Sequence, residues 1–391
     1  MSIDWCNMSI IRTRTCMGSP MSKPLFLYKK LFVFLCAACL AIAPLFSGSR
    51  PKDATEPPPQ EQAGGLVPGE PAMIGPHVII EAPDVNPYST NFFEVWAYLI
   101  ADSEEYLDNS FPITDLGYFS AEVNTYGELV GVPNPKKLAG YPGRIHMVVA
   151  CNSTSLTHFA LDPDGKVRGK LIDDLVKATE DFDGLQIDFE LVPKRDKDTF
   201  HSFIQELRRR LPHKLLSVAL PARTRTLKDD VYDYKRLSAL VDKVFVMAYD
   251  EHWATSRPGP IASIDWCNNI AEHSLETIGR EKLVMGLPFY GRTWGEVSLN
   301  RAFYFSGIQR TMRENGVTAA DIIRKEHIPT FTYEVPSVTV TSYYDDVQSL
   351  SVRLDNYFDM GVKAVGFWCL GQEDPRIWSH LSVSQREEVT P

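Results

Sequence analysis

The chain contains, at residues 182–190, the sequence Phe182-Asp183-Gly184-Leu185-Gln186-Ile187-Asp188-Phe189-Glu190. Its period of two predicts a short buried strand, with apolar side chains on one face and Gln186, Asp188 and Glu190 on the other. In a parallel sheet the apolar face packs against helices, which leaves the opposite face with buried acids. Burying charge costs free energy, so we expect these acids to have a function. We interpret this face as part of an active centre. The alternative is a solvent-facing edge strand with incidental acids.

Two carboxylates on this strand are same-face neighbours. Asp188 and Glu190 are expected to lie roughly 6–7 Å apart, a distance at which the charge of one raises the pKa of the other. One of them then keeps a proton near neutral pH. The pair therefore has the form of a general acid beside an orienting anion.

Apolar, strand-like runs alternate with helical patterns from His77 onward, over about 300 residues, which is long enough for one large α/β domain. Eight such runs predict a closed (β/α)8 barrel, the TIM barrel. A doubly wound open sheet is the alternative, but no glycine-rich phosphate loop follows the first strand. The predicted strands are Glu94–Ile100, Leu116–Ala121, Ile145–Cys151, Phe182–Phe189, Leu215–Pro221, Val244–Tyr249, Leu283–Phe289 and Val362–Trp368.

The first part of the chain has the pattern of a targeting segment. Three lysines precede an apolar run at residues 31–46, and small residues follow it, so residues 1–49 are predicted to be a signal sequence or an N-terminal membrane anchor. Residues 50–76 are rich in Pro and Gly and are predicted to be an extended linker. The barrel is assigned to residues 77–380 and a C-terminal tail to residues 381–391. We therefore expect an extracytoplasmic protein (periplasm, cell envelope or secreted), either released or tethered to the membrane.

Composition excludes several classes of protein. A net charge of −10 and a pI near 5.5 argue against nucleic-acid binding, which needs a basic face. Outside the leader only Cys151, Cys267 and Cys369 occur, which form neither a disulfide framework nor a metal-ligand spacing. The histidines show no ligand spacing either. We expect no metal, no other cofactor and a monomer.

In a barrel of this kind the chemistry gathers at the C-terminal ends of the strands. Acids, tyrosines and a tryptophan at that mouth suit a sugar, because aromatic faces stack on pyranose rings and hydroxyls need fixed donors and acceptors. The residues expected there are Glu190 on the fourth strand, Tyr249 and Asp250 on the sixth, Tyr290 and Arg292 on the seventh, and Trp368 on the eighth.

Four motifs together resemble one enzyme family, glycoside hydrolase family 18, the chitinase family. The sequence DGLQIDFE at residues 183–190 is similar to its DGxDxDxE signature. VMAYD at residues 246–250 resembles its sixth-strand motif, LVMGLPFYGRTW at 283–294 its seventh-strand motif, and GFW at 366–368 its terminal tryptophan strand. The motifs occur in the right order and span about residues 93–378.

Within that family, residues 187–190 and 370–378 look most like the bacterial spore-germination and cell-wall branch. That resemblance implies a partner that is an oligo- or polysaccharide containing N-acetylglucosamine. Attached LysM modules are frequent in the branch, and none is visible in this sequence.

The mechanism that the resemblance implies is retaining and substrate-assisted. Glu190 would protonate the glycosidic oxygen while the substrate's own 2-acetamido carbonyl attacks the anomeric carbon. Asp188 would orient the acetamido N–H, and Tyr249 would bind the acetamido oxygen. Asp250 would contact ring hydroxyls, and Trp368 would form the floor under the sugar.

Three further residues are assigned to substrate binding: Gln186, Tyr290 and Arg292. Structural alternatives stand beside these roles. Asp250 could cap the next helix, Tyr290 and Arg292 could shape a loop, with Arg292 paired to an acid, and the other two aromatic residues could be ordinary barrel aromatics.

The sequence departs from the family pattern at two places. Gln186 stands where the signature has an Asp, and since Gln can hydrogen-bond but cannot share a proton, the relay behind Asp188 is weakened. Residues 149–152 stand where many relatives have a Ser-x-Gly-Gly turn.

A small insertion is predicted between the seventh and eighth strands, at residues 295–341. Phe331–Val335 and Val338–Ser342 have the pattern of a β-hairpin. Such an insertion would wall one side of a cleft. Tyr333 and Tyr343 would then either touch the sugar or pack inside the insertion.

The sequence thus predicts an exported retaining glycoside hydrolase that cleaves β-linked N-acetylglucosamine polymers of the peptidoglycan or chitin type. A catalytically silent, lectin-like relative on the same barrel is the main alternative, and the presence of both Glu190 and Asp188 argues against it. A structural envelope protein would leave the acidic, aromatic mouth unexplained.

Overall fold

The structure is a computed structural model, and it describes residues 72–74, 78–80, 88–296 and 300–384. The predicted leader and nearly all of the predicted linker lie outside these residues. Among the residues described, no helix is both long enough and apolar enough to cross a membrane.

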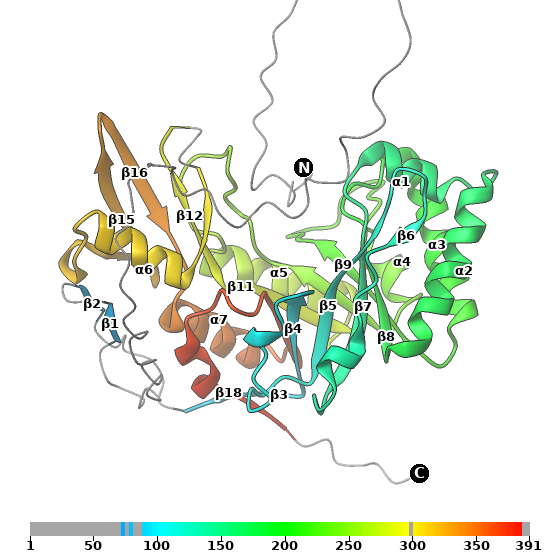
Figure 1. Cartoon of the computed structure of the whole chain (residues 1–391), viewed down its shortest axis with the longest axis horizontal. Coiled ribbons are helices and arrows are strands. Elements are labelled where there is room, and N and C mark those ends of the chain that lie inside the picture. Colours follow the sequence, from blue (N-terminus) through cyan, green and yellow to red (C-terminus); the bar gives the residue numbers. More distant parts are fainter. Residues whose placement is uncertain (1–71, 75–77, 81–87, 297–299, 385–391) are drawn as a thin grey trace, which may run out of the picture. The chain divides into compact units, whose positions relative to one another are not determined.

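Eight parallel strands close into the predicted barrel (Figure 1). Each barrel strand pairs with the next barrel strand along the chain, beginning with β4 and β5. The last strand, β17, pairs with the first, β4, and this pairing closes the ring. Every predicted strand is confirmed within a few residues. The barrel strands are β4 (Glu94–Ile100), β5 (Asp115–Val123), β7 (Arg144–Ala150), β8 (Gly184–Asp188), β9 (Leu215–Pro221), β10 (Lys243–Met247), β11 (Leu283–Pro288) and β17 (Ala364–Trp368).

Helices cover the outside of most of the barrel. The two connections between β4, β5 and β7 are exceptions, because they contain short 3₁₀ turns, Glu104–Tyr106 and Pro135–Leu138, instead of α-helices. The short strand β6 (Leu129–Val130) extends β5 as a hairpin. The α-helices around the barrel are α1 (Thr154–Leu161), α2 (Lys166–Ala178), α3 (Lys197–Arg210), α4 (Tyr234–Ser238), α5 (Ile264–Thr277) and α7 (Val347–Asp359).

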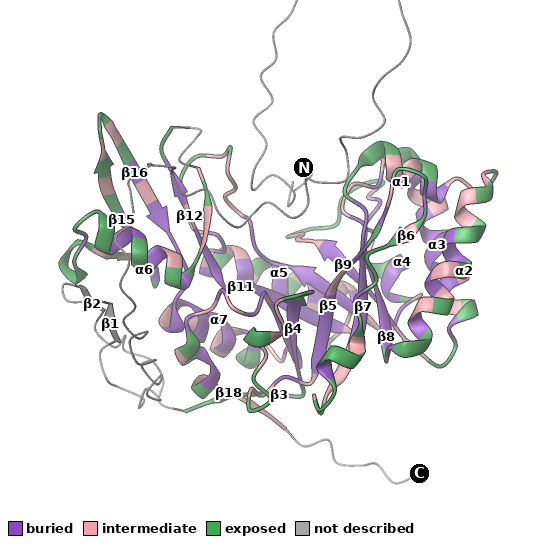
Figure 2. Ribbon diagram, in the orientation of Figure 1, coloured by how far each residue is buried: buried purple, intermediate pink, exposed green. Residues whose placement is uncertain are grey.

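The alternation within β8 works as the sequence predicts. Leu185 and Ile187 are fully buried against the helical layer, together with the apolar stripe of α3. Gln186 and Asp188 point the other way, into the barrel. In Figure 2 most of the length of the barrel strands is buried, and exposure rises on the outer faces of α2 and α3. Burial of two apolar faces against each other therefore fixes which side of β8 carries the acids.

Large aromatic side chains fill the barrel interior opposite glycines. A Cβ atom at Gly286 or Gly366 would lie within 2.7 Å of the Phe245 ring, and one at Gly117 would meet the Tyr98 ring at 2.9 Å. The three glycines lie on β11, β17 and β5, and each leaves room for an aromatic ring where a larger residue would place a side chain. The barrel is a packed core below its mouth.

A charged cluster closes the opposite end of the barrel, at the N-terminal ends of the strands. Asp115 accepts two hydrogen bonds from Arg144, at 2.6 and 2.7 Å, and lies 2.8 Å from Nε2 of His146. Glu94 lies 2.9 Å from the Lys243 ammonium. Burial opposes ionisation of Asp115, but the bonds from His146 and Arg144 hold its pKa at about 2. At this end of the barrel both carboxylates therefore have cationic partners.

The insertion between β11 and β17 is larger than predicted. It forms a five-stranded antiparallel sheet in the order β13-β12-β16-β15-β14, with its own small core and helix α6 (Phe305–Glu314). The predicted hairpin is confirmed as β15 and β16. Its strands are β12 (Tyr290–Trp294), β13 (Ala302–Tyr304), β14 (Ile323–Lys325), β15 (Ile328–Val335) and β16 (Val338–Tyr343).

One assignment at the seventh strand has to be corrected. Tyr290 and Arg292 were expected at the end of the barrel strand, but β11 ends at Pro288, and both residues belong to β12 of the insertion sheet. Only Phe289 separates the two strands. The motif at residues 283–294 therefore contains a barrel strand and the first strand of the insertion.

Two short strand pairings involve residues that the sequence assigned to the linker and to the C-terminal tail. Residues Leu381–Val383, expected to begin a tail, form β18 and pair in parallel with β3 (Thr90–Phe92). The strands β1 (Ala72–Ile74) and β2 (Val78–Ile80) pair with each other, so strand pairing begins inside the predicted linker.

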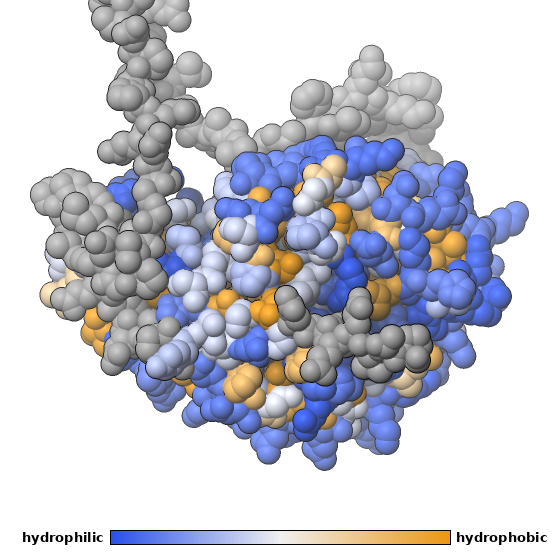
Figure 3. Space-filling view, turned by 90° about the horizontal axis from the view of Figure 1, so that it is seen from below, coloured by the Kyte–Doolittle hydropathy of each residue, from blue (hydrophilic) through white to orange (hydrophobic). Residues whose placement is uncertain are grey.

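The face of the molecule in Figure 3 is mostly hydrophilic at its rim, with hydrophobic side chains scattered between polar ones.

Candidate active site

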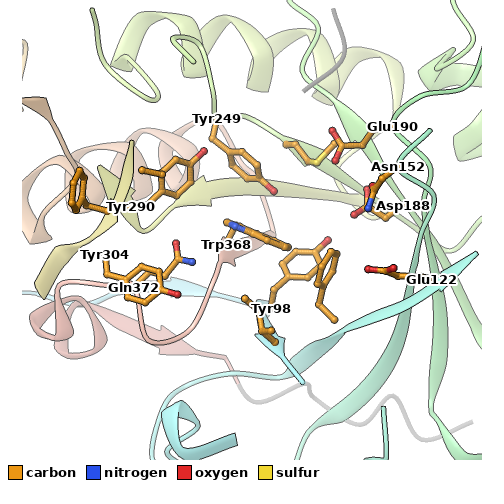
Figure 4. Close-up of a pocket in the computed structure, with 15 residues that line it drawn as sticks. Tyr98, Glu122, Asn152, Asp188, Glu190, Tyr249, Tyr290, Tyr304, Trp368 and Gln372 are labelled. Atoms are coloured by element: carbon orange, nitrogen blue, oxygen red, sulfur yellow. The ribbon is translucent and has the colours of Figure 1, made fainter. Parts of the chain in front are cut away.

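A pocket opens at the C-terminal ends of the barrel strands, and Figure 4 shows the side chains that line it. Asp188, Asn152 and Glu122 lie on one side of it, Tyr290, Tyr304 and Gln372 lie on the other, and Trp368 lies between them. Of the eight predicted site residues, five line this pocket: Asp188, Glu190, Tyr249, Tyr290 and Trp368.

Asp188 is a strongly perturbed acid in the pocket. It is 6% exposed, and its Oδ1 atom is buried without a hydrogen-bond partner. Burial raises the pKa of this carboxyl to about 7. The pair was expected to contain one protonated acid because of mutual repulsion, whereas desolvation is the cause that the structure gives.

Glu190 lies just beyond the end of β8 and faces the same pocket. The turn that carries it is held from behind by Tyr232, which follows β9. The Tyr232 hydroxyl donates to the carbonyl oxygen of Phe189 at 2.8 Å and accepts from the amide of Val192 at 3.1 Å. One side chain thus fixes the backbone on both sides of Glu190. Sequence reasoning missed this residue, since Tyr232 lies 42 positions further on and outside every motif.

Aromatic side chains form the floor and one wall of the pocket. The Trp368 ring lies 5.2 Å from that of Tyr98 and 4.8 Å from that of Phe119, measured between ring centroids. Tyr249 is buried beside them, and burial holds its pKa well above the ordinary value, so its hydroxyl stays protonated and can donate. The pocket offers a flat apolar surface with phenolic donors around it.

Gln186 does not reach the pocket. It is fully buried one row below Asp188, where its Oε1 accepts from the Tyr98 hydroxyl and its Nε2 donates to Ser217 Oγ at 3.2 Å. No hydrogen bond joins it to Asp188 in the described part of the chain. Gln186 therefore orients Tyr98, and the substrate contact assigned to it is not made from this position.

Asp250 and Arg292 lie behind the pocket wall, where they form a pair. Asp250 accepts from the Tyr290 hydroxyl at 2.7 Å and from the Arg292 guanidinium at 3.3 Å. Burial raises the pKa of Asp250, and Arg292 partly offsets this. Of the alternatives open from sequence, the pairing of Arg292 with an acid is the one found. Tyr290 is the member of this group that faces the pocket.

Sequence reasoning missed most of the wall that lies near the first three strands and in the insertion. The signal for some of it was available, because Tyr98, Phe119, Glu122 and Asn152 all come at or after the C-terminal ends of predicted strands. Of the others, Ile100 and Met247 are the last residues of β4 and β10, and the rest come from β13 and from the segment after β17. The missed residues are Tyr98, Ile100, Phe119, Glu122, Asn152, Met247, Ala302, Phe303, Tyr304 and Gln372.

Tyr333 and Tyr343, the two insertion tyrosines considered for sugar contact, do not line the pocket. Tyr333 packs beside Phe331 in the core of the insertion, and Tyr343 packs against Trp294. Their packing role is therefore the correct alternative. Phe303 and Tyr304 of β13 are the insertion aromatics that reach the pocket.

Within the described ranges no three His, Cys, Asp or Glu side chains are grouped closely enough to hold an ion. The chemistry that this geometry supports is proton transfer by carboxyl groups beside an aromatic platform.

The comparison with known families agrees with this geometry. The sequence profile of "Glycosyl hydrolases family 18" matches residues 153–373, more than half of the chain. The chain belongs to this family. The matched segment runs from the start of α1 to the turn after β17 and includes Asp188, Glu190, Tyr249 and Trp368.

Individual relatives are distant. YdhD of Bacillus subtilis (strain 168) is 30% identical over 56% of this chain and 54% of its own, and the cortical fragment-lytic enzyme of Bacillus anthracis is 24% identical over 69% of this chain and 67% of its own. The chain thus spans about half the length of YdhD.

Two solved structures share the fold. The spore cortex-lytic enzyme SleL of Bacillus cereus has a TM-score of 0.67 at 22% identity, covering 77% of each chain, and a chitinase from Chromobacterium violaceum has 0.62 at 22%, covering 74% of this chain and 97% of its own.

The buried Asp188 predicts a pH-dependent stability that its amide variant lacks. An unfolded Asp has a pKa near 4, so between about pH 4 and pH 7 the folded protein holds a proton that the unfolded chain releases. The free energy of unfolding should therefore fall as the pH rises through this window, by at most about 1.4 kcal/mol per pH unit from this group, and level off above it.

In Asp188→Asn this contribution is absent. Urea unfolding of both proteins at several pH values from 4.5 to 8 measures the difference. The variant should gain stability relative to the parent as the pH rises. A constant difference across the range would mean that Asp188 is ionised throughout.

Proposed function

We propose that this protein is a retaining glycoside hydrolase that cleaves β-linked N-acetylglucosamine polymers of the peptidoglycan or chitin type. The observation that carries the proposal is the position of Asp188 and Glu190, which face one pocket floored by Trp368. The names of its relatives support it, since they include a cortical fragment-lytic enzyme and a chitinase.

Glu190 acts as the general acid in this proposal. It lies at the open side of the turn after β8, and it protonates the glycosidic oxygen as the bond to the leaving sugar breaks. The carbonyl oxygen of the substrate's 2-acetamido group attacks the anomeric carbon from the other face, giving an oxazolinium-like intermediate. Water, deprotonated by Glu190, then opens the intermediate with overall retention.

Asp188 serves the acetamido group. Its unpartnered Oδ1 atom is a vacant acceptor, which the acetamido N–H can fill. A hydrogen bond to the charged form lowers a carboxyl pKa, so binding of substrate favours the ionised Asp188 that the positive intermediate requires. The raised pKa of about 7 favours the protonated form of Asp188 in the empty pocket, and a donor on the substrate shifts the group toward the anion.

The aromatic residues position the sugar. Trp368 supplies the apolar floor, and the Tyr249 hydroxyl donates to the acetamido oxygen. Asp250, which was expected to contact ring hydroxyls itself, acts through the Tyr290 hydroxyl that it binds at 2.7 Å. Tyr290 is therefore the residue we assign to the ring hydroxyls.

The proposal includes a site of action outside the cytoplasm. It rests on the apolar run at residues 31–46, which follows three lysines and precedes small residues. The segment would direct the barrel across the membrane and either be removed or remain as a tether.

The first test of the mechanism is Glu190→Gln. This change removes the proton donor and keeps its size and hydrogen bonding, so kcat on a chitooligosaccharide should fall by about 10²- to 10⁴-fold while ligand affinity is retained. Turnover and calorimetric binding are measured on the same preparations.

Substrate structure supplies the matched control. Replacing the acetamido group of the sugar at the cleaved bond by a hydroxyl removes the internal nucleophile, so such a glucoside should be inert to the parent enzyme. Parent-rate hydrolysis by the variant would refute the role of Glu190. Binding without turnover in the parent would favour the lectin-like alternative.

A second variant tests how Glu190 is held. Tyr232→Phe keeps the ring and removes the hydroxyl, leaving the Phe189 carbonyl and the Val192 amide without their partner. We expect about a tenfold loss of kcat, with little change in KM and a shifted acid limb of the pH–rate profile.

Tyr234→Phe is the control, because its hydroxyl also donates to a backbone carbonyl, that of Pro221 at 2.8 Å, away from the Glu190 turn. Its pH–rate profile should match that of the parent. Identical profiles for all three proteins would show that Tyr232 has only a structural role.

Localisation is tested by adding protease to intact spheroplasts of the native cell. The barrel should be digested while a cytoplasmic marker protein survives. Protection of both would place the protein in the cytoplasm and remove this part of the proposal.

A further inference from the structure

We propose that Glu122 makes the pocket selective against glycans that carry a negative charge beside the cleaved bond. The inference rests on the proposed function and specifies its substrate class. Sugars such as N-acetylglucosamine are neutral, whereas N-acetylmuramic acid carries a lactyl carboxylate. Glu122 discriminates between these two kinds of neighbour.

The sheet register places Glu122 close to the catalytic acids. Glu122 of β5 pairs with Ala150 of β7, and Ala150 pairs with Asp188 of β8. The three residues form one row across adjacent strands, so the Cα atoms of Glu122 and Asp188 lie roughly 10 Å apart. The Glu122 side chain lines the pocket and is exposed. Figure 4 shows it on the same side as Asp188 and Asn152.

The described lining of the pocket contains carboxyl groups and no basic side chain. Three carboxyl groups line it, those of Glu122, Asp188 and Glu190, and its described lining contains no Lys, Arg or His. Arg292 is nearby but lies behind Tyr290, 3.3 Å from Asp250. An anionic substituent on a bound sugar would therefore meet carboxylates without a cation to pair with.

Asp188 gives an independent reason to expect the same preference. The Asp188 residue lines the pocket and is more than nine-tenths buried, and its Oδ1 atom has no hydrogen-bond partner among the described residues. Such an atom is satisfied by a hydrogen-bond donor on the ligand. An anion close to Asp188 would oppose the ionisation of this carboxyl, which the proposed mechanism requires.

Of the three acids, Glu122 is the one that the proposed mechanism does not use. A like charge on the ligand at about 7 Å weakens binding by about threefold in a water-like dielectric, and by about fiftyfold in a partly screened one. The discrimination should shrink as added salt screens the two charges.

The experiment measures binding, so that it does not depend on turnover. The full chain carrying Glu190→Gln is titrated calorimetrically with two oligosaccharides of alternating N-acetylglucosamine and N-acetylmuramic acid. In one the lactyl carboxylate is free, and in the other it is converted to the neutral amide. The neutral ligand should bind about tenfold more tightly at low salt, and the ratio should fall in 0.5 M NaCl.

Adding Glu122→Gln to this background should bring the ratio of the two Kd values to within about twofold of unity. Glu105→Gln is the matched control. It removes the same charge from an exposed glutamate that follows β4 and lies outside the pocket lining. This control should leave the ratio unchanged.

The outcomes separate the two proposals. An unchanged ratio in Glu122→Gln, or tighter binding of the carboxylated ligand, overturns the selectivity. If the ratio responds to Glu122→Gln but the parent enzyme cleaves neither oligosaccharide nor a chitooligosaccharide, the selectivity stands and the hydrolase proposal fails. If neither of the two oligosaccharides binds, both the selectivity and the hydrolase proposal fail.

Discussion

The burial of one carboxyl group, that of Asp188, is the constraint on which the site depends. A desolvated acid without a hydrogen-bond partner costs free energy, and the fold accepts this cost because the apolar face of β8 is packed against α3. Turning the strand over would place Gln186 and Asp188 against the apolar stripe of α3 and would remove Leu185 and Ile187 from it. The same alternation that stabilises the barrel thus holds an acid at its mouth in a state that a ligand donor can change.

The pKa values of the buried acids at the two ends of the barrel are shifted in opposite directions. At the N-terminal end Asp115 is paired with Arg144 and His146, and its pKa is held at about 2. At the mouth no cation of the described lining lies beside Asp188, and its pKa rises to about 7. Both groups are buried to a similar degree, so the presence or absence of partners decides the difference. A paired charge stabilises the structure, and an unpaired one is available for chemistry.

How much the sequence predicts depends on how local the signal is. The strands, the helix stripes and the acids of β8 follow from short periodic patterns, and they were predicted. Tyr232 and the pairing of Asp250 with Tyr290 and Arg292 depend on contacts between segments far apart in the chain, which no local pattern encodes. The seventh-strand motif was assigned to one strand because its apolar run continues through Phe289, whereas the chain leaves the barrel there. Gln186 was placed in the pocket because its side of the strand was right, but its depth along the strand is not visible in an alternating pattern.

The single residue between β11 and β12 determines how the cleft can change. Phe289 is buried, its ring stacks on that of Phe367 at 4.5 Å, and its amide donates to the Trp368 carbonyl at 2.9 Å. The insertion sheet therefore begins from a rigid joint, without the loop that a hinged lid would need. Its distance from the opposite wall is set by core packing, so the width of the cleft is a fixed dimension of the fold. New substrate preferences would then arise by exchanging side chains such as Phe303 and Tyr304 on a stationary wall, and the barrel could tolerate such exchanges without repacking.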